Sequence, residues 1–187
     1  MHTLDHCMFW AACTLGYFGF LRAAEFTVPN QASFSPLLHL TVTDIAVDAP
    51  SSPACMRIKI KVSKTDPFRK GANIHIGLGH PPLCAVHAMM TYLSQRGSSP
   101  GPLFLLQDGR PLSRGILTDW LRQTMSAAGI AGNFSSHSFH IGAAIVAACN
   151  GIPDYLIQAL GRWSSNGYQL YIRTPSESLA SLSQQLS

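Results

Sequence analysis

Two histidines in the last third of the chain have the spacing needed to hold an anion. His137 and His140 share one face of the first turn of a helix predicted over 137–150, which Ser135 or Ser136 would cap. The dipole and unpaired N–H groups at a helix start favour negative charge, so a phosphate would fit there. A metal site is one alternative for His-x-x-His, but no third ligand is suitably spaced and the glutamate of zinc proteases is missing. A Ser-His nucleophilic pair is another, although no G-x-S-x-G turn accompanies it.

The first element that must position such a site is an apolar helix predicted from about Thr3 to Ala24. It is apolar on nearly all sides, which is typical of a buried helix. Arg22 and Glu25 stand at its end with i,i+3 spacing. Taken alone, this pair indicates a surface ion pair that helps to end the helix.

A small β-sheet is predicted next. Short strands are expected over 38–43, 56–62 and 73–76, and the middle one alternates apolar residues with Arg57, Lys59 and Lys61. The turn at 64–67 would pair the last two strands into an antiparallel hairpin with a basic outer face.

Helices make up most of the remainder. They are predicted from Pro81 to Arg96, from a Ser113 cap to about residue 128, and over 154–160, with a strand at 103–106 and a weak helix in the tail. The expected fold class is therefore α+β, mainly α-helical, with a small antiparallel β-sheet or hairpin, in a single domain over 1–187.

Several sequence words, taken in order, resemble the catalytic domain of the tyrosine recombinases. These words are Gly-Phe-Leu-Arg-Ala-Ala-Glu at 19–25, the His137 helix start, Leu-Gly-Arg-Trp-Ser-Ser at 160–165, and Tyr-Ile-Arg at 171–173. The third word is most similar to the recombinases of DIRS-like and Ngaro-like retrotransposons, in which Trp replaces a histidine. The chain departs from the family at His140, where the second arginine is expected.

The resemblance implies a role for each matched residue. Arg22 would clamp the phosphate, with Glu25 holding its guanidinium, and a hairpin lysine would protonate the leaving oxygen. Lys64 is the best match for that lysine, with Lys61 and Lys70 as competitors, and Tyr171 is the nucleophile, with Tyr168 as the alternative. The implied catalytic set is Arg22, Lys64, His137, His140, Trp163 and Tyr171.

The resemblance also implies double-stranded DNA as the partner, and neither a metal nor a cofactor. The expected DNA-binding residues are Arg57, Lys59, Lys61, Arg69, Lys70, Arg162 and Arg173. A tail helix over 174–187 would dock on a neighbouring copy, giving a dimer or tetramer on DNA. The family's N-terminal DNA-clamping domain, the core-binding domain, is expected to be absent from this chain.

His140 makes catalysis the open question. Histidine offers at most two donors and is mostly neutral near pH 7, whereas arginine keeps its charge. Losing such a clamp costs on the order of 3 kcal/mol in transition-state stabilisation. The alternative function is therefore a catalytically inactive DNA-binding domain of a decayed or repurposed transposon recombinase. The fold should tolerate His140, because the position serves the substrate and not the core.

Composition sets the outer bounds. The 187 residues are 47% hydrophobic and carry a formal charge of +4, which suits one globular domain and is compatible with a polyanion. The five cysteines contain no C-x-x-C pair and are expected to be reduced, buried thiols of an intracellular protein. The resemblance to retrotransposon recombinases adds the expectation of a nuclear location. The apolar run 7–21 is shorter than the roughly 20 residues of a membrane span.

Overall fold

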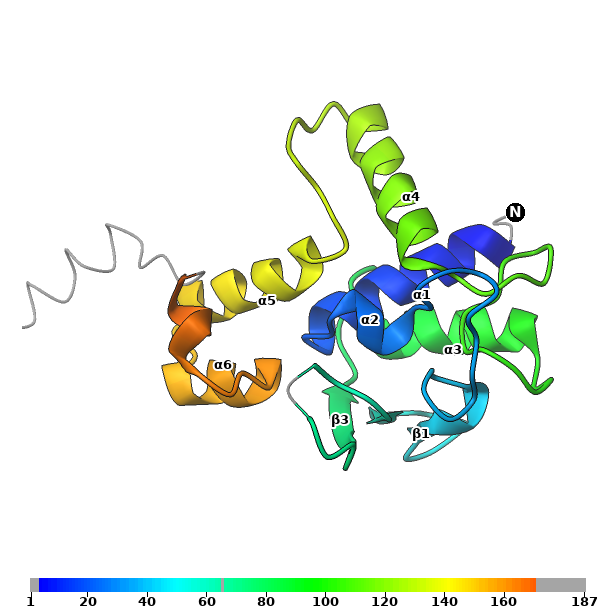
Figure 1. Ribbon diagram of the computed structural model, residues 1–187, viewed down its shortest axis with the longest axis horizontal. Coiled ribbons are helices and arrows are strands. Elements are labelled where there is room, and N and C mark those ends of the chain that lie inside the picture. The colour runs from blue at the N-terminus through cyan, green and yellow to red at the C-terminus, as the bar shows by residue number, and fades with distance from the viewer. Residues whose placement is uncertain (1–3, 65, 171–187) are drawn as a thin grey trace, which may run out of the picture.

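Six helices and one three-stranded sheet form the part of the chain that the computed structural model describes, residues 4–64 and 66–170 (Figure 1). The helices are α1 (Leu4–Phe18), α2 (Ala23–Phe26), α3 (Ala85–Arg96), α4 (Arg114–Ala127), α5 (Ser138–Cys149) and α6 (Asp154–Gly161), with 3₁₀ turns η1 (Val42–Asp44) and η2 (Asn166–Leu170). The strands are β1 (Ile45–Val47), β2 (Cys55–Ile60) and β3 (Ala72–Gly77). They pair antiparallel in the order β1-β2-β3, which confirms the predicted fold class.

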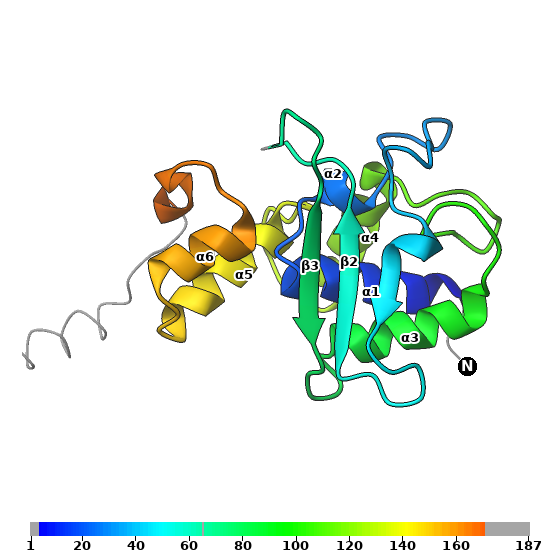
Figure 2. The same ribbon diagram turned by 90° about the horizontal axis from the view of Figure 1, so that it is seen from below.

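The main core lies between the sheet and two helices. Figure 2 shows the sheet lying across α1 and α3. Ile58 and Ile60 of β2 are buried against this layer together with Leu15 of α1, while the alternate residues Arg57 and Lys59 are exposed. The period of two in the sequence therefore set one face of β2 inward, as predicted.

A second, smaller apolar cluster joins α5 and α6 to the rest of the molecule. In Figure 1 these two helices lie to one side of the sheet and of α1. The cluster comprises Phe20, Ala143, Ala144, Ala147, Ile157 and Tyr168. Among the described residues, Phe20 is its one buried member from outside the C-terminal third, and Tyr17 packs against it, so the end of α1 and the segment after it are where the two parts of the fold meet.

The prediction of one helix from Thr3 to Ala24 was wrong. α1 ends at Phe18, and the chain turns at Phe20, whose φ of 49° is in the left-handed region. A new helix, α2, then begins with Arg22 as its N-cap. Aromatic side chains rarely adopt this backbone, so apolar periodicity alone did not reveal the break.

Two predicted strands were also wrong. Residues 38–43 form no strand, because the Asp44 carboxylate accepts bonds from both the N–H (2.8 Å) and the hydroxyl (2.7 Å) of Thr41 and thereby caps η1. Residues 103–106 form no strand and make one isolated bridge, Leu105 with Pro111. The predicted helix from Pro81 begins later, at Ala85, where the Cys84 sulfur caps it.

The five cysteines are free thiols, but only Cys13 and Cys84 are buried. Burial raises the pKa of Cys13 to about 12, so its thiol is unreactive near neutral pH. The expectation of burial was wrong for Cys149, which is exposed. None of the helices within residues 4–64 and 66–170 has the length and apolar character needed to cross a membrane.

Candidate active site

The turn between α1 and α2 holds Arg22 in a defined geometry. The Arg22 backbone N–H donates to Oε2 of Glu25 at 2.9 Å, and its Nη1 donates to Oε1 at 3.4 Å. The Glu25 side chain is 2% exposed, so the pair is not a loose surface ion pair. The carboxylate both caps α2 and orients the guanidinium, as the i,i+3 spacing permits.

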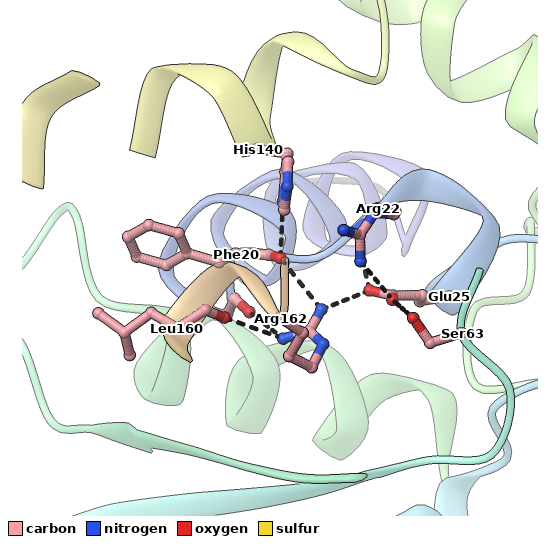
Figure 3. Close-up of polar contacts among 8 residues, drawn as sticks. Phe20, Arg22, Glu25, Ser63, His140, Leu160 and Arg162 are labelled. Atoms are coloured by element: carbon pink, nitrogen blue, oxygen red, sulfur yellow. Dashed lines mark hydrogen bonds and ion pairs between the residues drawn. The ribbon is translucent and has the colours of Figure 1, made fainter. Parts of the chain in front are cut away.

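Glu25 also collects donors from two distant segments, as Figure 3 shows. The hydroxyl of Ser63, in the loop between β2 and β3, donates to Oε1 at 2.7 Å. Nη2 of Arg162, at the end of α6, donates to Oε2 at 2.6 Å. One buried carboxylate therefore brings together the α1–α2 turn, the hairpin loop and the C-terminal end of α6.

Of the three candidate lysines, Lys64 is the one adjacent in sequence to a residue that bonds to Glu25. It is exposed and directly follows Ser63, which bonds to Glu25. Lys61 is instead engaged in the fold, since its Nζ pairs with Asp44 at 2.6 Å and donates to two backbone carbonyls. Lys70 is exposed and lies 5.9 Å from the ring centre of Phe68.

His137 lies beside the same site. It is the N-cap residue of α5 and is exposed, so the prediction that Ser135 or Ser136 caps this helix was wrong. Partial burial, and then the charges of Arg22 and Lys64, lower the pKa of His137. Its ring centre lies 5.8 Å from that of His140, and its pKa responds to the charges of two other predicted site residues.

His140 is a core residue. It is 1% exposed, and its Nδ1 donates to the backbone carbonyl of Phe20 at 2.8 Å. Because a carbonyl can only accept, Nδ1 carries the proton, and Nε2 is a buried acceptor without a hydrogen-bond partner among residues 4–64 and 66–170. Burial lowers the pKa of His140 to about 4, so the imidazole is neutral at pH 7. The expectation that position 140 does not serve the core was wrong.

Trp163 covers His140. The two ring centres are 4.4 Å apart, and the Trp163 ring also lies 5.9 Å from that of Tyr168. Gly161 permits this arrangement, because a Cβ there would fall 1.6 Å from the Trp163 ring. Tyr168 is only 4% exposed and serves packing in the second cluster. The predicted nucleophile Tyr171 lies outside the described residues.

Arg162 has a place in the site that sequence reasoning missed, because the sequence indicated only a DNA-binding charge. Its side chain is 14% exposed, and it bonds to Glu25 and to the Phe20 carbonyl (3.1 Å). The one signal in the sequence was its position between Gly161 and Trp163, inside the Leu-Gly-Arg-Trp-Ser-Ser word that resembles the recombinases. Ser63 was also missed, and a lone serine beside a turn carried no such clue.

Four of the other predicted DNA-binding residues are exposed. Arg57 and Lys59 project from the outer face of β2, and Arg69 and Lys70 are exposed in the loop that follows it. Arg173 lies outside the described residues. Within residues 4–64 and 66–170, no three His, Cys, Asp or Glu side chains gather in a way that could hold a metal ion.

Comparison with solved structures identifies the fold. The chain is similar to XerH site-specific recombinase bound to a palindromic difH substrate (TM-score 0.68, 14% identity, 98% of this chain and 46% of that one). It is also similar to XerA recombinase (0.68, 18%, 97% and 57%) and to a lambda integrase dimer bound to a COC′ core site (0.60, 16%, 89% and 52%).

The chain thus spans about half the length of these proteins. No protein-family model and no curated protein matches the sequence. The layered arrangement of α1, α3 and the antiparallel sheet, with α5 and α6 beside it, is shared with solved recombinases and integrases over nearly the whole chain. The chain therefore has the fold of the tyrosine recombinase catalytic domain.

Proposed function

We propose that this chain cleaves and rejoins DNA as the catalytic domain of a tyrosine recombinase. The observation that carries the proposal is the convergence on Glu25, which gathers Arg22, the Lys64 loop and the segment that bears Trp163. Such a cluster can neutralise a phosphodiester and protonate a leaving group. The similarity to solved recombinases supports the same reading.

Each residue has a defined part in the proposed reaction. The Tyr171 phenol oxygen attacks the phosphorus while the bond to the 5′ oxygen breaks, which gives a 3′-phosphotyrosyl bond and a 5′ hydroxyl. His137 takes the phenol proton or holds a phosphate oxygen, and Lys64 gives a proton to the leaving oxygen. Arg22 binds the non-bridging oxygens through its planar guanidinium. The 5′ hydroxyl of a second strand reverses the step, so no external energy source is needed.

The biological setting is also part of the proposal. The Leu-Gly-Arg-Trp-Ser-Ser word supports a mobile element related to DIRS-like or Ngaro-like retrotransposons, and hence a nuclear site of action. Assembly as a dimer or tetramer on DNA through residues 174–187 belongs to the same proposal. Two of the similar proteins are DNA-bound, and one of them is a dimer.

A nicked suicide duplex tests the reaction, with a covalent protein–DNA adduct scored on a denaturing gel. We expect an adduct from the natural chain that disappears in Tyr171→Phe and persists in Tyr168→Phe. Persistence of the adduct in Tyr171→Phe would contradict the assignment of the nucleophile.

The buried state of His140 favours a second candidate, a DNA-binding domain that has lost catalysis. A neutral imidazole bonded to the Phe20 carbonyl cannot replace the charge of a second arginine. In this case the natural chain binds duplex DNA without forming an adduct, and His140→Arg restores the adduct. An adduct from the natural chain would exclude this candidate.

A further inference from the structure

Arg162 is built into the site more firmly than a DNA-contacting surface arginine. Its φ of 52° lies in the left-handed region, where glycine or asparagine is favoured at a helix end. Nη1 donates to the carbonyls of Leu160 (3.1 Å) and Gly19 (3.5 Å), and Nη2 donates to the carbonyl of Phe20 and to Glu25 (Figure 3). A side chain with four acceptors inside the protein is committed to holding the protein's own groups.

Backbone strain is concentrated at the same junction. Within the described residues, Phe20, Arg69 and Arg162 are the residues other than glycine with positive φ. Two of these three bond to each other, because Nη2 of Arg162 donates to the Phe20 carbonyl. Strained backbone that a structure retains in this way is typical of functional sites.

The contact lengths at Glu25 indicate how Arg162 acts on Arg22. The Arg162 contact with the carboxylate is short, at 2.6 Å, whereas the Arg22 side-chain contact is long, at 3.4 Å. Two guanidinium groups thus share one carboxylate, and the longer contact of Arg22 leaves its donors less engaged and available to an outside anion. Without Arg162, Glu25 would draw Arg22 closer and neutralise it.

We propose that Arg162 is the positioning residue of this site, which occupies one oxygen of Glu25 so that Arg22 stays oriented and available to pair with the DNA phosphate. Through the Phe20 carbonyl it also ties the segment that leads to Tyr171 to the α1–α2 turn. The inference rests on the proposed function and deepens it. It places the second guanidinium of the site at position 162, in a role that acts through Glu25.

The test is a double-variant cycle in the full chain. Arg162→Asn suits the left-handed backbone but removes the charge, and we expect it to lower the rate of adduct formation by about tenfold to a hundredfold, as misplacement of a reacting group does. Adding Glu25→Gln to Arg162→Asn should recover part of that rate, because the uncompensated carboxylate is gone. If Arg162 only stabilised the fold, adding Glu25→Gln to Arg162→Asn would leave the rate of adduct formation unchanged, or would lower it by the same factor as in the natural chain.

Two further variants keep the test decisive. Arg162→Lys keeps the charge beside Glu25 and should retain the rate within about threefold, since an ammonium can still occupy the carboxylate. If Arg162→Asn does not fold, the comparison of Arg162→Lys with Glu25→Gln/Arg162→Lys replaces it, and adding Glu25→Gln should then lower the rate. Arg110→Asn removes the same charge from an exposed ion pair and should match the natural chain.

Failure of the proposed function gives a different result from failure of this inference. If the natural chain forms no adduct, the affinity for the same nicked duplex becomes the readout, with Arg22→Gln marking the share that depends on Arg22. Loss of affinity in Arg162→Asn, with recovery in the double variant, still supports the positioning role. Rates and affinities of Arg162→Asn equal to those of the natural chain would overturn it, as would additive losses in the cycle.

Discussion

At the residue scale, His140 is buried in the protein, although the family resemblance leads one to expect a phosphate-binding arginine at this position. An arginine at this position would keep its charge, but the imidazole is enclosed by Trp163 and donates to a backbone carbonyl. Its neutral state has a consequence for stability that a measurement can isolate. Folding lowers the pKa of His140 from an ordinary value of 6.5 to about 4.

We predict that the chain loses stability as the pH falls from 6.5 to about 4. In that window the unfolded chain binds a proton at His140 while the folded chain does not, so acid favours unfolding by up to about 3 kcal/mol from this residue. His140→Asn keeps a donor for the Phe20 carbonyl without titrating. Urea unfolding at several pH values should therefore show a steeper acid loss for the natural chain than for His140→Asn. Equal slopes would contradict the buried neutral state.

His140→Arg should destabilise the free protein even where it helps catalysis. The new guanidinium would lie near Arg22 and Arg162, which already share Glu25, so a charge would be buried without a matching carboxylate. We expect a loss of about 2–4 kcal/mol in the free energy of unfolding, part of which duplex DNA should restore by binding the folded state. Thermal unfolding with and without duplex DNA measures both effects, and a variant as stable as the natural chain without DNA would contradict the prediction.

At the scale of elements, the packing at the C-terminal end of α6 requires glycine, which has no side chain, at position 161. The Trp163 ring occupies the space where a Cβ of residue 161 would lie. The contact is with a side chain and not with backbone, so the ring should move while the helix persists. The pairing of Trp163 with His140 is therefore set by Gly161.

Gly161→Ala should displace Trp163 from His140 and cost about 1–2 kcal/mol of stability, because overpacking outweighs the gain in helix propensity. Trp163 fluorescence in a Trp10→Phe/Trp120→Phe background reports the ring's surroundings. Gly115→Ala in α4 is the matched control, since a Cβ there would find its nearest neighbour at 3.9 Å. The control should be neutral or stabilising, and an unchanged Trp163 spectrum in Gly161→Ala would contradict the packing argument.

At the scale of the whole molecule, the outer face of the sheet and the cluster around Glu25 indicate where we expect the proposed DNA partner to bind. The exposed charges of β2 lie on the strand that leads into the Ser63–Lys64 loop, and that loop bonds to Glu25. A duplex that contacts this strand would therefore lie close to Arg22. The net charge of +4 does not by itself indicate which face of the protein would contact DNA.

Arg57→Gln/Lys59→Gln should weaken binding to all duplex sequences alike and reduce the slope of log affinity against log salt by about 2, which corresponds to two phosphate contacts. Fluorescence anisotropy over a range of salt concentrations measures the slope. Arg110→Gln, which removes an exposed charge outside the predicted set, serves as the control. An unchanged slope in the double variant would place the DNA on another face.

Local patterns in the sequence determined much of this protein. The alternation in β2 predicted its buried face and the Ser113 cap predicted α4, whereas the i,i+3 spacing of Arg22 and Glu25 indicated only that the two side chains share one face. These features depend on propensities and periodicities within a few residues, which a sequence displays directly. The order of the motifs likewise indicated the fold that the solved recombinases share.

Only the tertiary structure decided how the motifs meet. The break after Phe18 turns the Phe20 carbonyl toward two side chains that follow more than a hundred residues later. Arg162 and Glu25 are 137 residues apart in sequence, and their 2.6 Å contact follows from the packing of α5 and α6 against the body. Burial of His140 under Trp163 has the same origin. Long-range packing sets the burial of His140 and the charge sharing at Glu25, and no local pattern reports either of these two features.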